Sequence, residues 1–453
     1  MATFSIENFG CRATEADAAA LRRGLLTSGL LLATDGSSAD LVVLNTCTVT
    51  AAADSQTRDA IRKIHRANPA ARIIVTGCYA QRAPEEISAL EGVTWVIGNS
   101  HQNEIPRIAG ELIAQPSAPA SSIQHAAGKN FVPGSLLQKD QMSLARGPAK
   151  ILTGDIFAQT SVQVAPADVV EGDRTRPVLK IQDGCNNRCA YCVIPFVRGR
   201  SRSLPPAEVI AEARKLVASD AREIVLSGIN LGAYGRDLSP RASLYDVIHR
   251  ILEETELEQL RLSSVEPQDV TEELISLVTS SDRLAPHFHV PLQSGSDRIL
   301  RAMHRWYRAG HYAERVKRVR QMSPNAAIGA DVIVGFPGEA NEDFKATFDL
   351  IEDLPFTYLH VFSFSARPGT EGANLSAEPV PATVVRERAR ALRALAQKKS
   401  SEFRATQAER SLRALTLVGG EDNWTPALTA NYLKVRISGR HPANQWHETR
   451  ISL

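Results

Sequence analysis

The amino-acid sequence predicts an α/β protein with a doubly wound N-terminal domain, a central partial (β/α)6 barrel and a small C-terminal β module. Three observations support this prediction. Short β-branched apolar runs alternate with helix-period segments over residues 1–112, six strand–helix units follow between residues 177 and 370, and short strands fill residues 412–453. A strand followed by a crossover helix builds a parallel sheet, and 453 residues exceed what one hydrophobic core organises.

The N-terminal domain is expected to form a small parallel sheet. Leu41–Leu44 and Ile73–Val75 are runs of the kind buried in parallel sheets, and Thr94–Ile97 is a third. Ala51–Ala67, between the first two runs, has the period of a helix. Residues 113–175 are rich in Ala, Ser, Pro, Gly and Gln without sustained periodicity, so we expect a linker with some local structure there.

The barrel domain, residues 176–383, contains six expected strands, most of which run into loops rich in Gly, Ser, Asn or Pro. The strands are Val178–Ile181, Glu223–Leu226, Leu260–Ser263, Phe288–Val290, Ala330–Val334 and Leu359–Phe364. In such barrels the chemistry takes place at the carboxyl ends of the strands. A helix rich in Arg, Ala and Leu is expected over residues 384–411, and it leads into the C-terminal module at 412–453.

The composition is that of a soluble globular protein, and we expect a cytoplasmic one. Apolar residues make up 43% of the sequence, and the N-terminus lacks the basic and apolar regions of a secretory signal. No apolar stretch approaches the roughly 20 residues that span a bilayer, so no membrane association is expected. The net charge is only +2, but residues 384–453 hold thirteen Lys and Arg against six Asp and Glu. That excess favours an anionic partner, with a solvated helix face as the alternative.

Cys185, Cys189 and Cys192 form a C-x3-C-x2-C run in the loop after the first barrel strand. A structural zinc site takes four protein ligands, and no fourth cysteine follows this run. A 4Fe–4S cube held by three cysteines keeps one iron open to an outside ligand. The run therefore indicates a cluster that can chelate a small molecule and pass it an electron. Reduced thiols scattered through the core are the alternative.

The other three cysteines share a placement, since each follows the end of an expected strand. Cys11 follows the run at residues 4–8, while Cys47 and Cys78 follow the next two strands. Because the carboxyl ends of parallel strands meet at one edge of a sheet, we expect these thiols to converge. A second three-cysteine iron–sulfur cluster is the preferred interpretation. The alternatives are three unrelated buried thiols, or a zinc site with His65 or an acidic side chain as its fourth ligand.

Several longer motifs occur in order along the chain. They are Gly10-Cys11, Asn45-Thr-Cys-Thr-Val-Thr50, Thr76-Gly-Cys-Tyr-Ala-Gln81, Lys180-Ile-Gln-Asp-Gly-Cys185, Tyr191-Cys-Val-Ile-Pro195, His289-Val-Pro-Leu-Gln-Ser-Gly-Ser-Asp297 and Asp331-Val-Ile-Val-Gly-Phe-Pro-Gly338. Together they resemble the methylthiotransferase family of radical S-adenosylmethionine (SAM) enzymes over nearly the whole chain. The resemblance implies an N-terminal cluster domain, a radical SAM barrel and a C-terminal TRAM-like domain, which is a small RNA-binding β module. It also implies SAM and two 4Fe–4S clusters, one on each set of three cysteines.

Within this family the sequence is most similar to the MtaB type, on the basis of Asn45–Thr50 and Ser227–Gly232. That similarity implies action on N6-threonylcarbamoyladenosine beside the tRNA anticodon. One alternative is a family member acting on isopentenyladenosine in tRNA or on an aspartate of a ribosomal protein. Another is an iron–sulfur or zinc protein that binds RNA without catalysis. Arg12–Glu15 and Trp306 depart from the family pattern, so the finer substrate contacts stay open.

The resemblance further implies the reaction. The cluster at Cys185, Cys189 and Cys192 would bind SAM and cleave it to a 5′-deoxyadenosyl radical, which abstracts hydrogen from C2 of the adenine. The inserted sulfur would come from the cluster at Cys11, Cys47 and Cys78, and a second SAM would methylate it. Candidate SAM contacts on the loops after the barrel strands are Gly228, Asn230, Glu266, Gln293, Ser294 and Asp331. Each of these residues also suits a loop-capping role.

RNA contacts are expected at two places, the loop after the cysteine run and the tail. The basic residues concerned are Arg198, Arg200, Arg202, Lys434, Arg436 and Arg440. The first three alternate along the loop, where an extended chain would present them to phosphate groups, and solvated loop charge is the alternative. Trp424 or Tyr432 could stack on a base, although both also suit a core. The expected partners are tRNA and an electron donor of the flavodoxin or ferredoxin type, and we expect a monomer.

Overall fold

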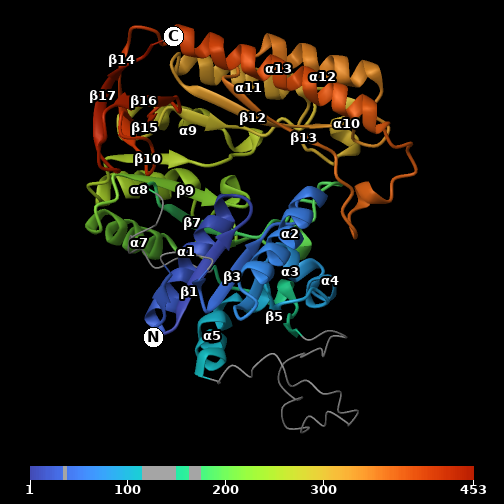
Figure 1. Cartoon of the computed structure of the whole chain (residues 1–453). Coiled ribbons are helices and arrows are strands. Elements are labelled where there is room, and N and C mark those ends of the chain that lie inside the picture. The colour runs from blue at the N-terminus through green and yellow to red at the C-terminus, as the bar shows by residue number, and fades with distance from the viewer. Residues whose placement is uncertain (34–37, 115–148, 163–174, 453) are drawn as a thin grey trace. The chain divides into compact units, whose positions relative to one another are not determined.

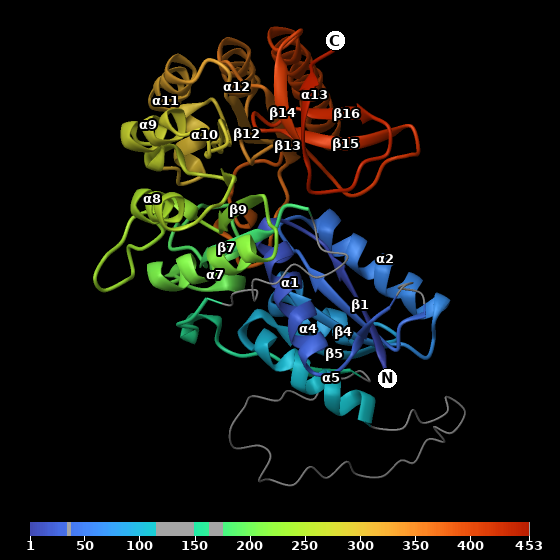
Figure 2. The ribbon, with the colours of Figure 1, turned by 90° about the vertical axis from the view of Figure 1, so that its left-hand side faces the viewer.

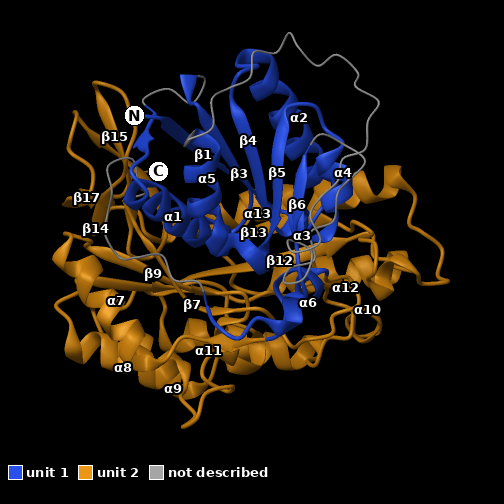
Figure 3. Cartoon of the chain, turned by 90° about the horizontal axis from the view of Figure 1, so that it is seen from below, with its two compact units in different colours: residues 1–166, 193–200 blue, residues 167–192, 201–453 orange. Residues whose placement is uncertain are grey.

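The computed structural model describes residues 1–33, 38–114, 149–162 and 175–452 (Figure 1). The chain divides into two compact units, which Figure 3 colours separately. Unit 1 comprises residues 1–166 together with 193–200, and unit 2 comprises residues 167–192 together with 201–453. The short segment 193–200 therefore belongs to the N-terminal unit, although it lies within the stretch of sequence that forms the barrel.

Unit 1 is built on a six-stranded parallel sheet with the strand order β2-β1-β3-β4-β5-β6. Its strands are β1 (Thr3–Asn8), β2 (Leu31–Leu32), β3 (Leu41–Thr46), β4 (Arg72–Gly77), β5 (Val93–Gly98) and β6 (Lys150–Leu152). Its helices are α1 (Arg12–Thr27), α2 (Ala51–Ala67), α3 (Cys78–Arg82), α4 (Pro84–Ser88), α5 (Ile105–Ala114) and α6 (Ile194–Arg198), with 3-10 turns at Asn99–Glu104 and Ile156–Ala158.

Helices cover both faces of this sheet because successive strand residues point to opposite sides. Val42 and Leu44 of β3 pack with Ile61 of α2 in one buried cluster. Leu41 and Val43, the residues that alternate with them, pack against α1 and α5 in a second cluster. The doubly wound domain predicted from the apolar runs is confirmed, and helix α2 has the predicted bounds.

Strand β6 lies in the segment 113–175 that the sequence predicted to be a linker. It extends the sheet at its edge by pairing with β5, with Trp95 opposite Lys150. Three residues are too few to show a period, which is why sequence analysis missed this strand. The segment predicted to be a linker with some local structure thus contains a strand at residues 150–152, and the rest of that prediction falls largely on residues 115–148 and 163–174, outside the described residues.

Unit 2 contains the predicted partial barrel, and all six predicted strands are present. They are β7 (Val178–Asp183), β9 (Glu223–Gly228), β10 (Gln259–Leu262), β11 (His287–His289), β12 (Ala327–Val334) and β13 (Tyr358–Ser363), with β8 (Arg202–Ser203) added antiparallel beside β7. The six pair in parallel as β7-β9-β10 and β11-β12-β13. A hydrogen bond of 2.9 Å from the Val265 amide to the His289 carbonyl links the two groups.

Helices of unit 2 follow the strands on one side, as Figure 2 shows for α7 to α12. They are α7 (Pro206–Ala218), α8 (Leu244–Glu254), α9 (Glu272–Ser280), α10 (Asp297–Ala302), α11 (Ala309–Met322), α12 (Asn341–Asp353) and α13 (Ala382–Thr406). Short 3-10 turns lie at Leu231–Ala233, Pro267–Asp269 and Glu371–Ala373. Among the described residues, no helix combines the length and the apolar character needed to cross a bilayer.

The C-terminal module is a four-stranded antiparallel sheet with the order β16-β15-β14-β17. Its strands are β14 (Ser411–Thr416), β15 (Trp424–Thr429), β16 (Lys434–Ser438) and β17 (Trp446–Arg450). Helix α13 ends at Thr406, five residues before the predicted end, and a turn leads into β14. The sequence predicts strands at Leu412–Val418, Tyr432–Ile437 and His447–Ile451, which correspond to β14, β16 and β17. Strand β15 is not among them, because Pro426 within it cannot donate to a ladder and argues against a strand.

The turn between β15 and β16 packs against the amino ends of the barrel strands. Tyr432, at a φ of +68°, stacks on the His287 ring with the centroids 4.3 Å apart. The fully buried guanidinium of Arg261 donates to the carbonyls of Thr429 and Ala430 and pairs with Glu223 at 2.6 Å. Tyr432 is therefore part of the packing between the module and the barrel, one of the two roles that the sequence allowed it.

Candidate functional site

Three cysteines of unit 1 lie at the carboxyl edge of its sheet. Cys11 immediately precedes α1, Cys47 follows the last residue of β3, and Cys78 is the first residue of α3 directly after β4. Strands β1, β3 and β4 are adjacent and parallel, so their carboxyl ends meet there. A Cβ atom added at Gly10, beside Cys11, would stand 2.8 Å from Cβ and 3.4 Å from Sγ of Cys47. The three thiols predicted to converge are brought together.

Burial makes two of these thiols, Cys47 and Cys78, poor anions in the absence of a cation. Cys47 and Cys78 are 5% and 2% exposed, whereas Cys11 is exposed. Burial, followed by the charges of Cys78 and Cys11, raises the pKa of Cys47 to about 12, and burial also raises the pKa of Cys78. Thiols of this kind give up their protons when a metal centre takes the place of the protons. Three converging sulfur donors fit an iron–sulfur cube that keeps one open iron.

His65 does not complete a zinc site with these cysteines. It lies in the last turn of α2, and its ring contacts the position of Gly92, just before β5 begins. That is the amino edge of the sheet, a full strand length from the carboxyl edge where the cysteines lie. The alternative of a zinc ion held by three cysteines and His65 is therefore wrong.

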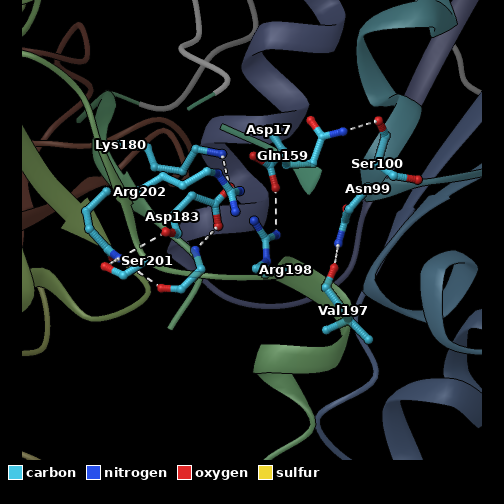
Figure 4. Close-up of polar contacts among 12 residues, drawn as sticks. Asp17, Asn99, Ser100, Gln159, Lys180, Asp183, Val197, Arg198, Ser201 and Arg202 are labelled. Atoms are coloured by element: carbon cyan, nitrogen blue, oxygen red, sulfur yellow. Dashed lines mark hydrogen bonds and ion pairs between the residues drawn. The ribbon is translucent and has the colours of Figure 1, made fainter. Parts of the chain in front are cut away.

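Helix α6 lines the cysteine pocket of unit 1, by which we mean the buried surroundings of Cys47 and Cys78, and Figure 4 shows its polar contacts to Asp17 and Asn99. Val193 and Val197 pack against Cys78 in one buried cluster. The Asn99 amide donates to the Val197 carbonyl at 2.8 Å and to Sγ of Cys78 at 3.5 Å. Arg198 donates to the carboxylate of Asp17 at 2.7 Å, and the two residues are only 2% and 1% exposed.

The position of Arg198 differs from the predicted one. The sequence predicted an extended basic loop that presents Arg198, Arg200 and Arg202 to RNA, but the chain is helical up to Arg198 and turns at Gly199. Arg198 is buried against Asp17, and Arg202 is buried beside Asp183, which also accepts from Lys180 at 3.0 Å (Figure 4). Arg200 alone of the three is exposed.

In unit 2, Cys185, Cys189 and Cys192 lie on the loop that follows β7. The Asn187 amide donates to Sγ of Cys185 at 3.4 Å, and the Cys192 amide donates to the Cys189 carbonyl at 3.0 Å, which closes a turn. All three are half-buried, and burial raises the pKa of Cys185. All six cysteines of the chain are free thiols. The donors on this loop again number three, so the second set also fits a cube with one open iron.

Arg305 is a functional candidate that sequence analysis missed. Its guanidinium donates to Sγ of Cys189 at 3.3 Å and forms an ion pair with Glu266. The Tyr307 ring lies 4.9 Å from the guanidinium carbon. Burial raises the pKa of Glu266, and the charge of Arg305 opposes that rise. Its partners are 116 and 39 residues away in the chain, so no local spacing could have indicated the role.

Two of the predicted SAM contacts lie beside the barrel cysteines. Gly228 ends β9, where an added Cβ would stand 2.9 Å from the Gln182 side-chain oxygen. The backbone N–H of Asn230 donates to that oxygen at 2.8 Å, and the side-chain Nδ2 of Asn230 lies 4.0 Å from Sγ of Cys185. The Oδ1 atom of Asn230 is buried with no hydrogen-bond partner among the described residues. A buried acceptor of this kind is suited to a ligand that donates to it.

The remaining predicted SAM contacts are held by protein neighbours. Gln293 has a φ of +64° and its backbone bonds to β12, while Ser294 is fully buried at 3.3 Å from the Thr347 hydroxyl. Asp331 lies 3.0 Å from Nε2 of His289 and 3.1 Å from Nδ1 of His360. Burial would raise the pKa of Asp331, but hydrogen bonds from the two histidines hold it below its ordinary value.

Exposed basic side chains remain on the edge strand of the C-terminal module. Lys434 and Arg436 occupy alternate positions of β16, so both point to one side of the sheet, and both are exposed. The guanidinium carbon of Arg436 lies 4.4 Å from the Trp424 ring centroid. This pair of cations and the ring beside them form one surface of the module.

Each of the two units contains a segment that matches a known protein family. Residues 179–351 match the radical SAM superfamily, and residues 3–98 match the uncharacterized protein family UPF0004. A protein of Aquifex aeolicus (strain VF5) named threonylcarbamoyladenosine tRNA methylthiotransferase MtaB is 35% identical, over 96% of this chain and 96% of its own length. The chain belongs to the methylthiotransferase family of radical SAM enzymes. A family member from Thermobifida fusca (strain YX), named tRNA-2-methylthio-N(6)-dimethylallyladenosine synthase, is 33% identical over 92% of this chain and 78% of its own length.

A solved structure supports the fold of this methylthiotransferase. The radical SAM methyltransferase TsrM from Kitasatospora setae, which was determined with cobalamin and a 4Fe–4S cluster, has a TM-score of 0.52 at 16% identity. The match covers 82% of this chain and 77% of that chain. Membership of the radical SAM superfamily implies one 4Fe–4S cluster and SAM for the methylthiotransferase described here, and the sulfur donors on the loop after β7 suit that cluster.

Proposed function

We propose that this enzyme converts N6-threonylcarbamoyladenosine in tRNA to its 2-methylthio derivative, with two SAM consumed and the sulfur drawn from a second iron–sulfur cluster. The observation on which the proposal rests is the presence of two separate sets of three cysteines in two units. One set serves SAM cleavage, and a methylthiotransferase also needs a store of sulfur. The Aquifex aeolicus relative, matched over nearly its full length, supports the choice of substrate.

When bound, the clusters and SAM supply the radical chemistry that replaces the C2–H bond of adenine by a C–S bond. Cys185, Cys189 and Cys192 would hold the cluster that binds SAM. Cys11, Cys47 and Cys78 would hold the second cluster. Gly10, at a φ of +132°, leaves the room beside Cys47 that a bulky inorganic group needs.

The side chains around the barrel cysteines would bind and orient SAM. Gly228 lets the chain pass close to the methionyl group, and Oδ1 of Asn230 accepts from an N–H donor of SAM. Arg305 pairs with Glu266 and opposes the rise in its pKa that burial causes, which suits this carboxylate to accept from the amino group or a ribose hydroxyl. Gln293, Ser294 and Asp331 complete the loops around this site. Tyr191, which is packed beside Ala190 and Phe336, helps to keep water out.

RNA contacts would be made by each unit separately, by Arg200 in unit 1 and by the exposed side of β16 in unit 2. Lys434 and Arg436 suit phosphate groups, and Trp424 offers a ring for stacking. An electron donor of the flavodoxin or ferredoxin type would reduce the cluster. We place the protein in the cytoplasm with its tRNA substrate and expect it to act as a monomer.

Nucleoside mass spectrometry of tRNA tests the proposal. A strain lacking the gene should lose 2-methylthio-N6-threonylcarbamoyladenosine and accumulate the unmethylthiolated nucleoside. The wild-type gene should restore the product, and the Cys189→Ala variant should not. The Thermobifida fusca relative makes the dimethylallyladenosine derivative the second candidate product. Loss of that nucleoside instead, with the threonylcarbamoyl product unchanged, would contradict the proposed substrate.

A further inference from the structure

Arg198 occupies an unusual place for an arginine, inside the cysteine pocket of unit 1. It is 2% exposed, and its partner Asp17 is 1% exposed. Burying two charges together is costly, and apolar residues of similar size often serve stability as well. Packing alone therefore does not explain why an ion pair lies here.

The surroundings of Cys78 suggest what this arginine does. The Asn99 amide donates to Sγ of Cys78 at 3.5 Å and to the Val197 carbonyl, one residue before Arg198. Arg198 follows Val197, which packs against Cys78, and its charge lowers the pKa of both Cys78 and Cys47. One amide donor therefore points at the Cys78 sulfur, and a full positive charge acts on both thiols.

Asp17 fixes the direction in which Arg198 points. It lies on α1, the helix that begins directly after Cys11, so the helix bearing one sulfur donor also bears the carboxylate. The 2.7 Å bond from Arg198 to Asp17 uses one branch of the guanidinium fork. The pair thereby holds the positive charge beside Cys78 and Cys47.

We propose that Arg198, held by Asp17, is a positioning residue for the cluster at Cys11, Cys47 and Cys78, and that it makes this cluster easier to reduce. The inference rests on the proposed function, because it requires a cluster at these cysteines. Hydrogen bonds to the sulfurs and the net charge around an iron–sulfur cluster set its reduction potential. A nearby cation stabilises the more negative, reduced form, so its removal shifts the potential to a more negative value.

The test measures this cluster alone. The full-length chain with Cys185, Cys189 and Cys192 replaced by Ala is reconstituted with iron and sulfide under anaerobic conditions. Iron content and the midpoint potential, from a redox titration followed by electron paramagnetic resonance, are then compared with and without Arg198→Met. We expect a more negative potential in the variant and an unchanged one for Arg200→Met, a control that removes an exposed arginine two residues away.

Two further variants guard against loss of the fold. Asp17→Asn combined with Arg198→Met removes the buried carboxylate together with its cation, and it should still give the more negative potential, so it decides where the single variant does not hold iron. Arg198→Lys keeps the positive charge, so its potential should stay close to that of the parent. A fall in Arg198→Lys as large as that in the Met variants would overturn the inference.

The outcomes separate the inference from the proposed function. A cluster that is retained with an unchanged potential in Arg198→Met or in the double variant overturns the inference and leaves the proposed function standing. A parent chain that binds no iron at Cys11, Cys47 and Cys78 overturns both.

Discussion

The two sets of cysteines reach the same number of sulfur donors by different routes. In unit 2, eight consecutive residues supply all three donors on one loop after β7. In unit 1, the carboxyl ends of β1, β3 and β4 are each followed by one donor, and the three donors span 68 residues of sequence. The first site depends on a local turn, and the second depends on the pairing of three strands.

The surroundings of the two sets differ as well. The barrel cysteines are half-buried and lie beside Arg305 and Asn230, groups that can also face a ligand. In unit 1, Cys47 and Cys78 are almost fully buried, and a buried ion pair adjoins them. The difference suits one site that exchanges a soluble cofactor and another that retains its group.

Removing one donor from each set should give the largest and most distinct effects. Cys189→Ala should abolish 5′-deoxyadenosine release, a loss of about a thousandfold or more. Cys47→Ala should keep SAM cleavage, because its site lies in the other unit, and should lose the methylthio product. Quantifying 5′-deoxyadenosine and modified nucleoside in the same anaerobic reaction separates the two. Equal loss of 5′-deoxyadenosine in both variants would contradict the assignment of SAM cleavage to the barrel cysteines and of sulfur supply to those of unit 1.

Arg261→Met should weaken unit 2 without emptying the cysteine pocket of unit 1. The change leaves the buried Glu223 with Arg176 alone, at 3.3 Å, and should cost about 3–5 kcal/mol of unfolding free energy. Urea unfolding followed by circular dichroism measures that loss. Iron bound at Cys11, Cys47 and Cys78 should be retained, so a variant lacking this iron would show that the units do not fail separately.

The same pair predicts a dependence of stability on pH. Burial would raise the pKa of Glu223, but Arg261 and then Arg176 hold it below 4.5, its ordinary value. Its contribution to stability is therefore fully present above pH 4.5 and is lost as the pH falls towards the lowered pKa. The stability gap between the wild type and Arg261→Met should narrow as the pH falls, because protonation of Glu223 removes the charge that the variant leaves with Arg176 alone.

Gly77→Ala should damage the cysteine site that depends on strand pairing. Gly77 has a φ of +96°, and an added Cβ would stand 2.4 Å from the Thr46 carbonyl oxygen of the neighbouring strand. We expect a loss of about 1–3 kcal/mol in stability and a drop from about eight to about four irons per chain. Gly110→Ala in α5, where nothing lies within 4 Å of the added Cβ, is the matched control and should keep all iron.

Lys434→Ala should give the smallest effect, since it removes one exposed cation from β16. Affinity for tRNA should fall by roughly 1 kcal/mol, and the slope of log K against log salt should fall by about one. Filter binding across a salt series measures both. Lys398→Ala, on the exposed side of α13, is the control and should leave both values unchanged. An equal effect of the two variants would indicate binding through general charge.

Local patterns predicted most of the fold. The six barrel strands and α2 were found because their apolar runs and helical period are complete within each segment. Strand β6 was missed because three residues show no period, and β15 was missed because Pro426 lies within it. Both strands form by pairing with neighbouring strands, and the local sequence does not reveal that pairing.

The candidate sites show the same limit. The run at Cys185 could be recognised from spacing alone, and the other set could be inferred from strand ends. Arg198 was assigned to RNA because a basic sequence looks the same whether it is exposed or buried, and its partner Asp17 is 181 residues away. Arg305 was missed for the same reason, since neither Cys189 nor Glu266 is near it in sequence.

The turn that carries Tyr432 has a consequence for the architecture of the enzyme. Because Thr429 and Ala430 accept hydrogen bonds from the buried Arg261, the C-terminal module covers the amino ends of the barrel strands. Removing the module would take two carbonyl acceptors from this buried arginine, as well as the proposed surface for nucleic acid. The module is thus a structural component of the barrel domain.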